Sequence, residues 1–197
     1  MTKLLLGTEN PGKIRELNSL LQGVNADLVI PGDLGLALHV DESGQTYAEN
    51  ASRKALFYSN ASGLLTLADD SGLEVDALNG APGLYSARYS PKTGATDKDR
   101  RDYLLEQLRG ISRPWPARFH CSVAIAAPEG VIHIADGVCP GEIIPEERGV
   151  SGFGYDPIFL VENMERTMAE LSMAVKNQIS HRGRAIEVVI PILLSYL

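Results

Sequence analysis

The segment from Leu4 to Lys13 reads Leu-Leu-Leu-Gly-Thr-Glu-Asn-Pro-Gly-Lys, and it joins an apolar run to a helix. Its first four residues predict a short buried strand. Asn10 is a favoured N-cap residue, and Pro11 fits the first position of a helix. Apolar residues then recur at helical spacing until Gly23, where the helix is expected to end. A strand that passes through one short loop into a helix is typical of an α/β fold.

The rest of the chain extends this pattern, with strands and helices alternating early and strands clustering late. Strands are predicted at residues 27–30 and 64–68, as a hairpin of residues 118–127 and 131–135, and at residues 138–144 and 157–160. Further helices are predicted to begin at Thr46, Thr96 and Ser180. Glu49 completes a capping box with Thr46, and Pro191 should kink or split the last helix. The expected fold class is α/β, with a mixed, elongated sheet flanked by helices.

Composition and charge exclude several classes of protein. The chain has 197 residues, 44% of them hydrophobic and 22% charged, which suits a single domain over residues 1–197. Its net charge of −7 argues against nucleic acid as a partner, because duplex binding needs a basic face. No apolar stretch approaches a signal peptide or a membrane span, so we expect a cytoplasmic protein with no membrane partner. Cys121 and Cys139 lack zinc-ligand spacing, and an apolar run around Cys121 predicts a buried reduced thiol.

The loop from Gly7 to Lys13 has the spacing G-x-x-x-x-G-K between a strand and a helix. A phosphate would be held there by backbone N–H groups, the helix dipole and the lysine charge. However, Ile14 stands where a P-loop has the Ser or Thr that ligates Mg²⁺, and Pro11 removes one backbone donor. A P-loop NTPase is therefore disfavoured. The loop by itself leaves an ordinary strand–turn–helix junction open as the alternative.

An acidic pair, Asp69 and Asp70, follows the strand predicted at residues 64–68, which is expected to end there. Carboxylates at a strand end suit a hard cation such as Mg²⁺, which prefers oxygen ligands. Side chains alternate along an extended strand, so the two carboxylates should face opposite ways and only one should reach a pocket. The alternative is an ordinary acidic turn that binds nothing.

The loop of residues 151–157 offers groups for a flat ligand. Gly152 and Gly154 allow close approach of the backbone, and Phe153 or Tyr155 could stack on a base. Asp156 could accept hydrogen bonds from ring N–H groups. The alternative is a glycine-containing turn with core aromatic residues.

The segment of residues 180–184 places His181 beside Arg182 at the start of a helix. Over a ligand, this pair could donate hydrogen bonds to a carbonyl and to an anion, and Lys176 could add charge. A solvated surface pair is the alternative.

Several different short motifs follow one another along the chain. They are Thr8 to Lys13, Glu49-Asn50-Ala51 with Lys54-Ala55, Ala68 to Leu73, Ala81-Pro82-Gly83, Tyr85 to Tyr89, Gly152 to Pro157, and Ser180-His181-Arg182. Each motif is weak alone, but the ordered set resembles the inosine/xanthosine triphosphate pyrophosphatases of the Ham1 type over residues 3–195. The resemblance implies Mg²⁺-dependent hydrolysis of ITP, dITP and XTP to the monophosphate and pyrophosphate, which keeps these nucleotides out of DNA and RNA. It also implies a homodimer whose protomers have two lobes with the active-site cleft between them.

The resemblance further implies roles for individual residues. The substrate-binding residues would be Thr8, Glu9, Asn10, Pro11, Gly12, Lys13, Ser71, Phe153, Gly154, Tyr155, Asp156, Lys176, His181 and Arg182. Within this set, Thr8, Asn10 and Lys13 would hold the triphosphate, Phe153 would stack on the base, and residues 156, 181 and 182 would read its edge. Asp70 would bind Mg²⁺ or act as the base toward water. Glu42 would be the second metal ligand, with Asp41 beside it as the other option.

Three positions depart from the family pattern. Glu9 stands where the family commonly has Gly, Tyr47 replaces a common Phe, and Ser151 precedes Gly152 where a further Gly is frequent. Glu9 matters most because it places a carboxylate beside the expected triphosphate, and it leaves open a pyrophosphatase of other modified or standard (d)NTPs. A non-catalytic nucleotide-binding protein is a third hypothesis, disfavoured because the acidic pair and Lys13 are all present.

Overall fold

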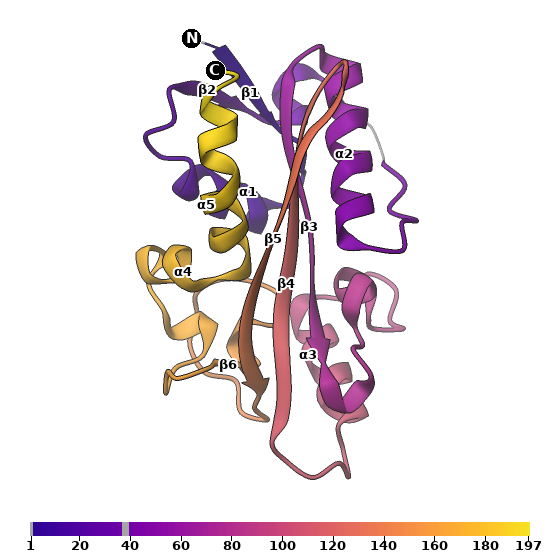
Figure 1. Cartoon of the computed structure of the whole chain (residues 1–197). Helices are drawn as coiled ribbons and strands as arrows, with labels where there is room; N and C mark the ends of the chain where they lie inside the picture. Colours follow the sequence, from indigo (N-terminus) through magenta and orange to yellow (C-terminus); the bar gives the residue numbers. More distant parts are fainter. Residues whose placement is uncertain (1, 37–39) are drawn as a thin grey trace. The chain divides into compact units, whose positions relative to one another are not determined.

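The computed structural model describes residues 2–36 and 40–197 of the chain (Figure 1). Its strands are β1 (Thr2–Leu6), β2 (Ala26–Val29), β3 (Leu65–Val75), β4 (Trp115–Ala127), β5 (Gly130–Ile143) and β6 (Phe159–Val161). Its helices are α1 (Pro11–Leu20), α2 (Tyr47–Ser62), α3 (Asp97–Gln107), α4 (Met173–Ile179) and α5 (His181–Leu194). Across these described ranges, no helix has the length and apolar character that crossing a membrane requires.

The strands form one mixed sheet in the order β2-β1-β3-β4-β5-β6. Strand β1 pairs in parallel with both β2 and β3, whereas β5 and β6 are antiparallel. Parallel neighbours need a crossover connection, and α1 and α2 lie in the two segments that connect these first strands. The α/β class with a mixed sheet flanked by helices is therefore confirmed.

The chain divides into two compact units that are each discontinuous in sequence. The first unit comprises the chain up to Asp70, Cys121–Gly137 and His181–Leu197, and the second comprises Ser71–His120 and Val138–Ser180. Strands β3, β4 and β5 each contribute one part to the first unit and one part to the second. A single domain with a cleft between two lobes stays a prediction.

In the first unit, strand residues face two different sets of helices. Figure 1 shows α2 on one side of these strands and α1 with α5 on the other. Leu4, Leu6 and Leu67 share a buried cluster with residues of α1 and α5, whereas Leu5 packs with Tyr58 of α2. Ala68 likewise packs with the alanines of α2. Because side chains alternate along a strand, this register also decides which way the residues after Ala68 point.

The second unit has its own core, built from apolar residues of α3 and the outer parts of the long strands. Leu104 and Leu108 are fully buried, as the helical spacing predicted, and they cluster with Trp115 and Phe119. Thr96 caps α3 and forms a capping box with Asp99. This core also includes Tyr155, which lies in one of the candidate ligand loops.

Two predicted strand boundaries are wrong. Strand β3 continues through the acidic pair to Val75 instead of ending at Ala68, because both carboxylates are buried against basic or amide partners. Strand β5 runs unbroken from Gly130 to Ile143 instead of forming two strands. Gly137 lies where the break was expected. A Cβ there would lie 2.0 Å from the carbonyl oxygen of His181, so the missing side chain leaves room for α5.

Two predicted helix features also differ. Pro191 lies within α5 without splitting it, because it is exposed and close to the C-terminal end, where one lost backbone hydrogen bond matters least. At the start of α2, the Thr46 hydroxyl accepts the Glu49 N–H as predicted. The Glu49 carboxylate, however, accepts the N–H of Gln45 at 2.8 Å, one residue earlier than a capping box requires.

Candidate active site

The loop before α1 is held by its own polar side chains. Asn10 caps the helix as predicted, since its Oδ1 accepts the N–H groups of Gly12 at 2.8 Å and of Lys13 at 3.2 Å. Thr8 Oγ1 accepts the N–H of Asn10 at 3.2 Å. Three of the backbone donors expected to hold a phosphate are thus already bonded, because side-chain oxygens of the loop accept from them. The attraction for an anion here rests on Lys13 and the helix dipole.

The other residues of this loop and of the acidic segment differ in exposure. Glu9 and Pro11 are exposed, Gly12 is buried, and Ser71 is half-buried next to Asp70 on β3. The Glu9 carboxylate therefore keeps its hydration. Burial raises the pKa of the Tyr58 hydroxyl, and the negative charge of Glu9 raises it further.

Lys13 is anchored to β3 by Asp69. Its Nζ lies 3.0 Å from Asp69 Oδ2 and donates to the backbone carbonyl of the same residue at 3.3 Å. An ammonium group has three N–H donors, so these two contacts leave one for a further acceptor. Asp69 therefore holds the Lys13 ammonium in place while one of its N–H groups can still donate to an acceptor.

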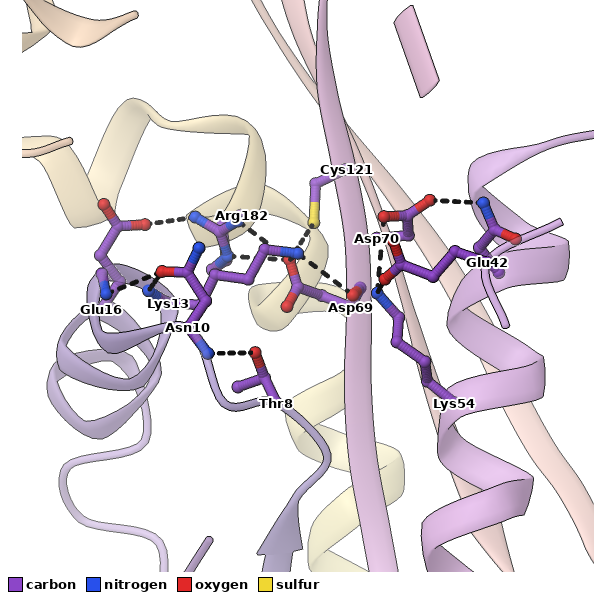
Figure 2. A network of polar contacts seen from close by, with 12 residues as sticks. Thr8, Asn10, Lys13, Glu16, Glu42, Lys54, Asp69, Asp70, Cys121 and Arg182 are labelled. Carbon is purple, nitrogen blue, oxygen red and sulfur yellow. Dashed lines mark hydrogen bonds and ion pairs between the residues drawn. The ribbon is translucent and has the colours of Figure 1, made fainter. Parts of the chain in front are cut away.

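Asp69 is the centre of a buried charged network on the α1 and α5 side of β3 (Figure 2). Its Oδ2 accepts from Arg182 Nε at 3.2 Å and Nη2 at 2.9 Å, and from the thiol of Cys121 at 3.7 Å. Arg182 Nη1 also bonds the carboxylate of Glu16. Burial alone would raise the pKa of Asp69, but Arg182 and Lys13 hold it well below its ordinary value. In this network the negative charges of Asp69 and Glu16 balance the positive charges of Lys13 and Arg182.

This network gives Arg182 and Cys121 specific surroundings. The Arg182 guanidinium is only 1% exposed and bonds two carboxylates, which is not the arrangement of the solvated pair considered above. Contact of Arg182 and of the neighbouring buried His181 with a base stays a prediction. Cys121 is a free, buried thiol as expected, and burial together with Asp69 raises its pKa, so the thiol stays protonated.

Asp70 points to the other side of β3, toward α2, so the two adjacent carboxylates do face opposite ways (Figure 2). Asp70 Oδ2 accepts from Asn50 Nδ2 at 2.9 Å, and Asp70 Oδ1 lies 3.5 Å from Lys54 Nζ. The same Lys54 nitrogen lies 2.7 Å from Glu42 Oε1. Asp70 and Glu42 therefore converge on a single ammonium group.

The loop that carries Glu42 is fastened to α2. Asn50 Oδ1 accepts the N–H of Gly44 at 2.8 Å, while its Nδ2 holds Asp70, so one amide side chain bridges the loop and the strand. A Cβ on Gly44 would lie 2.5 Å from that oxygen, so glycine alone fits this approach. Of the two neighbouring acids, Glu42 contacts Lys54 and Asp41 is exposed, which favours Glu42 as the second metal ligand.

Among the ion pairs described on this side of β3, two carboxylates meet one lysine. Burial would lower the pKa of Lys54, but Asp70, Asp69 and Glu42 raise it above its ordinary value. Two carboxylates thus share one lysine, and the excess of negative charge fits a divalent cation. Within residues 2–36 and 40–197, no three His, Cys, Asp or Glu side chains are gathered to hold a metal ion. Mg²⁺ commonly uses one or two carboxylates with waters and substrate phosphates, so the pair suits it.

In the second unit, Phe153, Asp156 and Lys176 form a separate group. Lys176 Nζ bonds Asp156 Oδ2 and lies 5.4 Å from the centre of the Phe153 ring. The same carboxylate oxygen accepts the Phe153 N–H at 2.9 Å. A Cβ on Gly152 would lie 1.9 Å from it, and the positive φ of 77° also favours glycine. The loop places an aromatic ring, a carboxylate and an ammonium side by side.

Tyr155 and Gly154 of this loop bond other parts of the protein instead of facing a ligand. The Tyr155 side chain is buried, and its hydroxyl donates to the carbonyl of Ser86 at 2.9 Å, so Phe153 rather than Tyr155 is the candidate for stacking. Gly154 is tied to α3, since its N–H donates to Asp97 and its carbonyl accepts from Arg101, both at 2.8 Å. These contacts occupy the backbone groups expected to face a ligand and fix the loop instead.

The structure adds three residues to which the sequence assigned no role. Glu16 lies one helical turn after Lys13, and Asn50 and Lys54 are four residues apart on the alanine-rich face of α2. All three are polar residues on a helix face that is otherwise buried, and this pattern in the sequence could have pointed to them. Their partners lie far away in the sequence.

Comparisons with known proteins identify the family of the chain. The model of the Ham1 family matches residues 4–192. A dITP/XTP pyrophosphatase of Desulforamulus reducens is 47% identical over 97% of this chain and 95% of its own length. One of Shigella flexneri is 45% identical over 96% and 97%. Among solved structures, a HAM1 protein from Coxiella burnetii has a TM-score of 0.87 and 40% identity, covering 99% of this chain and all of its own. The chain belongs to the Ham1 family.

Proposed function

We propose that this protein is an Mg²⁺-dependent nucleoside-triphosphate pyrophosphatase that hydrolyses ITP, dITP and XTP to the monophosphate and pyrophosphate. The observation that carries the proposal is the split of the acidic pair across β3. One carboxylate anchors the phosphate-binding lysine, and the other joins Glu42 in a group with excess negative charge. The relatives named dITP/XTP pyrophosphatases support the same substrates.

The phosphate end of the reaction falls to the first unit. Lys13 offers its remaining N–H to a phosphate oxygen, and Asp70 positions or deprotonates the attacking water. Asn50 keeps Asp70 oriented through its amide. Mg²⁺, held by Asp70 and Glu42, would supply the charge that offsets the phosphate oxygens and the leaving pyrophosphate.

At the base end we assign roles to Phe153, Asp156 and Lys176. Phe153 would stack on the purine, while Lys176 donates to the 6-oxo group and Asp156 accepts from the neighbouring ring N–H. Adenine presents the reverse pattern, with an amino donor and an unprotonated ring nitrogen. The two hydrogen bonds made with a 6-oxo purine would then be missing, and donor would face donor at Lys176, which discriminates against ATP.

A substrate panel tests the proposal. Purified protein is given ITP, dITP, XTP, GTP, ATP and dTTP, each with Mg²⁺ and with EDTA, and released pyrophosphate is measured. We expect Mg²⁺-dependent release from ITP, dITP and XTP far above that from the standard nucleotides. Release mainly from GTP, ATP or dTTP would favour the alternative of a pyrophosphatase for other (d)NTPs. ITP binding without turnover would favour a non-catalytic protein.

Glu9→Gln should lower the KM for ITP by about two- to fivefold, because it removes an exposed negative charge beside the triphosphate. The difference should shrink at high ionic strength, since exposed charges are screened. Steady-state kinetics at low and high salt measure both effects. Glu129→Gln, an exposed acid in the turn between β4 and β5, is the matched control. An unchanged KM in Glu9→Gln would show that the carboxylate points away from the phosphates.

Three further properties belong to the proposal. We expect residues 1–197 to act as one domain, which the single family model over residues 4–192 supports. We also expect a homodimer, and sedimentation at two concentrations measures that state. A cytoplasmic location follows from the proposed role, because non-standard nucleotides must be removed where DNA and RNA are made.

A further inference from the structure

Lys54 stands where two carboxylates meet. Its Nζ lies 2.7 Å from Glu42 Oε1 and 3.5 Å from Asp70 Oδ1, and these are the two side chains that the proposed function assigns to the divalent cation. The lysine itself has no part in that assignment. Its ammonium already occupies the position of a cation between them (Figure 2).

The surroundings of Lys54 hold its side chain in this direction. The residue is only 7% exposed and lies on the face of α2 that carries Ala51 and Ala55, so its stem is buried. Asn50, one helical turn earlier, holds Asp70 and the loop before α2 in place around the ammonium. The lysine is therefore a built part of the carboxylate pair and not a mobile surface group.

The charges around Lys54 differ from those around Lys13, which contacts Asp69 on the other face of β3. Lys13 belongs to a network in which Asp69 and Glu16 are balanced by Lys13 and Arg182. Lys54 is contacted by two carboxylates, Glu42 and Asp70. It reduces the repulsion between them, but a positive charge this close also repels any second cation that approaches the same oxygens.

We propose that Lys54 is a resident cation that holds Glu42 and Asp70 together, and that its ammonium gives up this position when a divalent cation is bound by the two carboxylates. This inference rests on the proposed function, because it takes Glu42 and Asp70 as the metal ligands. It assigns Lys54 as a positioning residue of the metal-free protein.

The test is Mn²⁺ affinity in the nucleotide-free protein, measured from the loss of the free-ion signal in electron paramagnetic resonance. Lys54→Met removes the charge and keeps the apolar stem, so we expect the dissociation constant for Mn²⁺ to fall about tenfold or more. Lys92→Met is the matched control, because Lys92 pairs with Asp99 at 2.6 Å on the exposed surface. That variant should bind Mn²⁺ like the wild type. Unchanged or weaker binding by Lys54→Met overturns the proposal.

A second measurement uses the wild-type protein and serves if Lys54→Met does not fold. The rate of lysine acetylation is followed residue by residue by mass spectrometry, with and without saturating Mg²⁺. Displacement predicts that acetylation of Lys54 becomes severalfold faster with Mg²⁺, while that of Lys92 does not change. Equal or slower acetylation of Lys54 contradicts displacement.

Failure of this inference can be told apart from failure of the proposed function. If wild type hydrolyses ITP with Mg²⁺ but Lys54→Met gains no affinity for Mn²⁺, only the role of Lys54 is wrong. If Lys54→Met gains affinity while no nucleotide of the panel is hydrolysed, the cation exchange holds and the proposed reaction is wrong.

Discussion

Asp70→Asn is expected to lower kcat for ITP hydrolysis by about 10³-fold or more, because the amide can neither accept a proton from water nor carry the charge that binds a divalent cation. The effect should be in kcat rather than only in KM, since Lys13, the proposed phosphate ligand, lies on the other face of β3. Initial rates of pyrophosphate release with saturating ITP and Mg²⁺ measure it. Near-normal turnover would remove Asp70 from the chemistry.

The fold should survive this substitution. The Asn50 amide can still donate to the new side-chain oxygen, and Lys54 keeps Glu42 as its partner. One negative charge of an unbalanced group is removed, so we expect the free energy of unfolding to change by less than about 1 kcal/mol. Urea denaturation followed by circular dichroism checks this, and a large loss of stability would mean that lost activity reports unfolding.

Asp69→Asn is expected to lower the free energy of unfolding by about 3–5 kcal/mol, the usual effect of removing one partner from a buried ion pair. Asp69 is fully buried and is contacted by both Lys13 and Arg182. Without its charge, the buried Arg182 and the partly buried Lys13 lose the carboxylate that they share. Urea denaturation measures the loss, and the KM for ITP should also rise because Lys13 loses its anchor.

Asp70→Asn is the matched control for this prediction. It makes the same chemical change one residue further along the same strand, on the face where negative charge is in excess. We therefore expect opposite outcomes, with one variant unstable and the other stable but inactive. Equal stability of the two variants would contradict the distinction between a balanced and an unbalanced face.

Local rules made much of the site predictable. The N-cap at Asn10 depends on residues within one turn, and it is formed as expected. The opposite orientation of Asp69 and Asp70 follows from alternation along a strand, although the strand itself is longer than predicted. In both cases the deciding contacts lie close in the sequence, so propensity and periodicity were sufficient.

Other predictions failed because distant residues decided them. The end of β3 was placed too early, since two adjacent carboxylates look like a turn until their buried partners are known. Tyr155 was a candidate for stacking, but its hydroxyl finds Ser86, which is 69 residues earlier. A polar or aromatic group is stable inside a protein only when such a partner meets it, and no local pattern reveals the partner.

By itself, the sequence determined the α/β class, the Asn10 cap of α1, the two-faced acidic pair and the family. Only the tertiary structure decided what each charge does. Arg182 reaches Asp69 and Glu16 across 113 and 166 residues, and Lys54 meets Asp70 across 16. The physical reason is that the energy of a charge depends on its neighbours in space and on its access to water, and folding alone sets both.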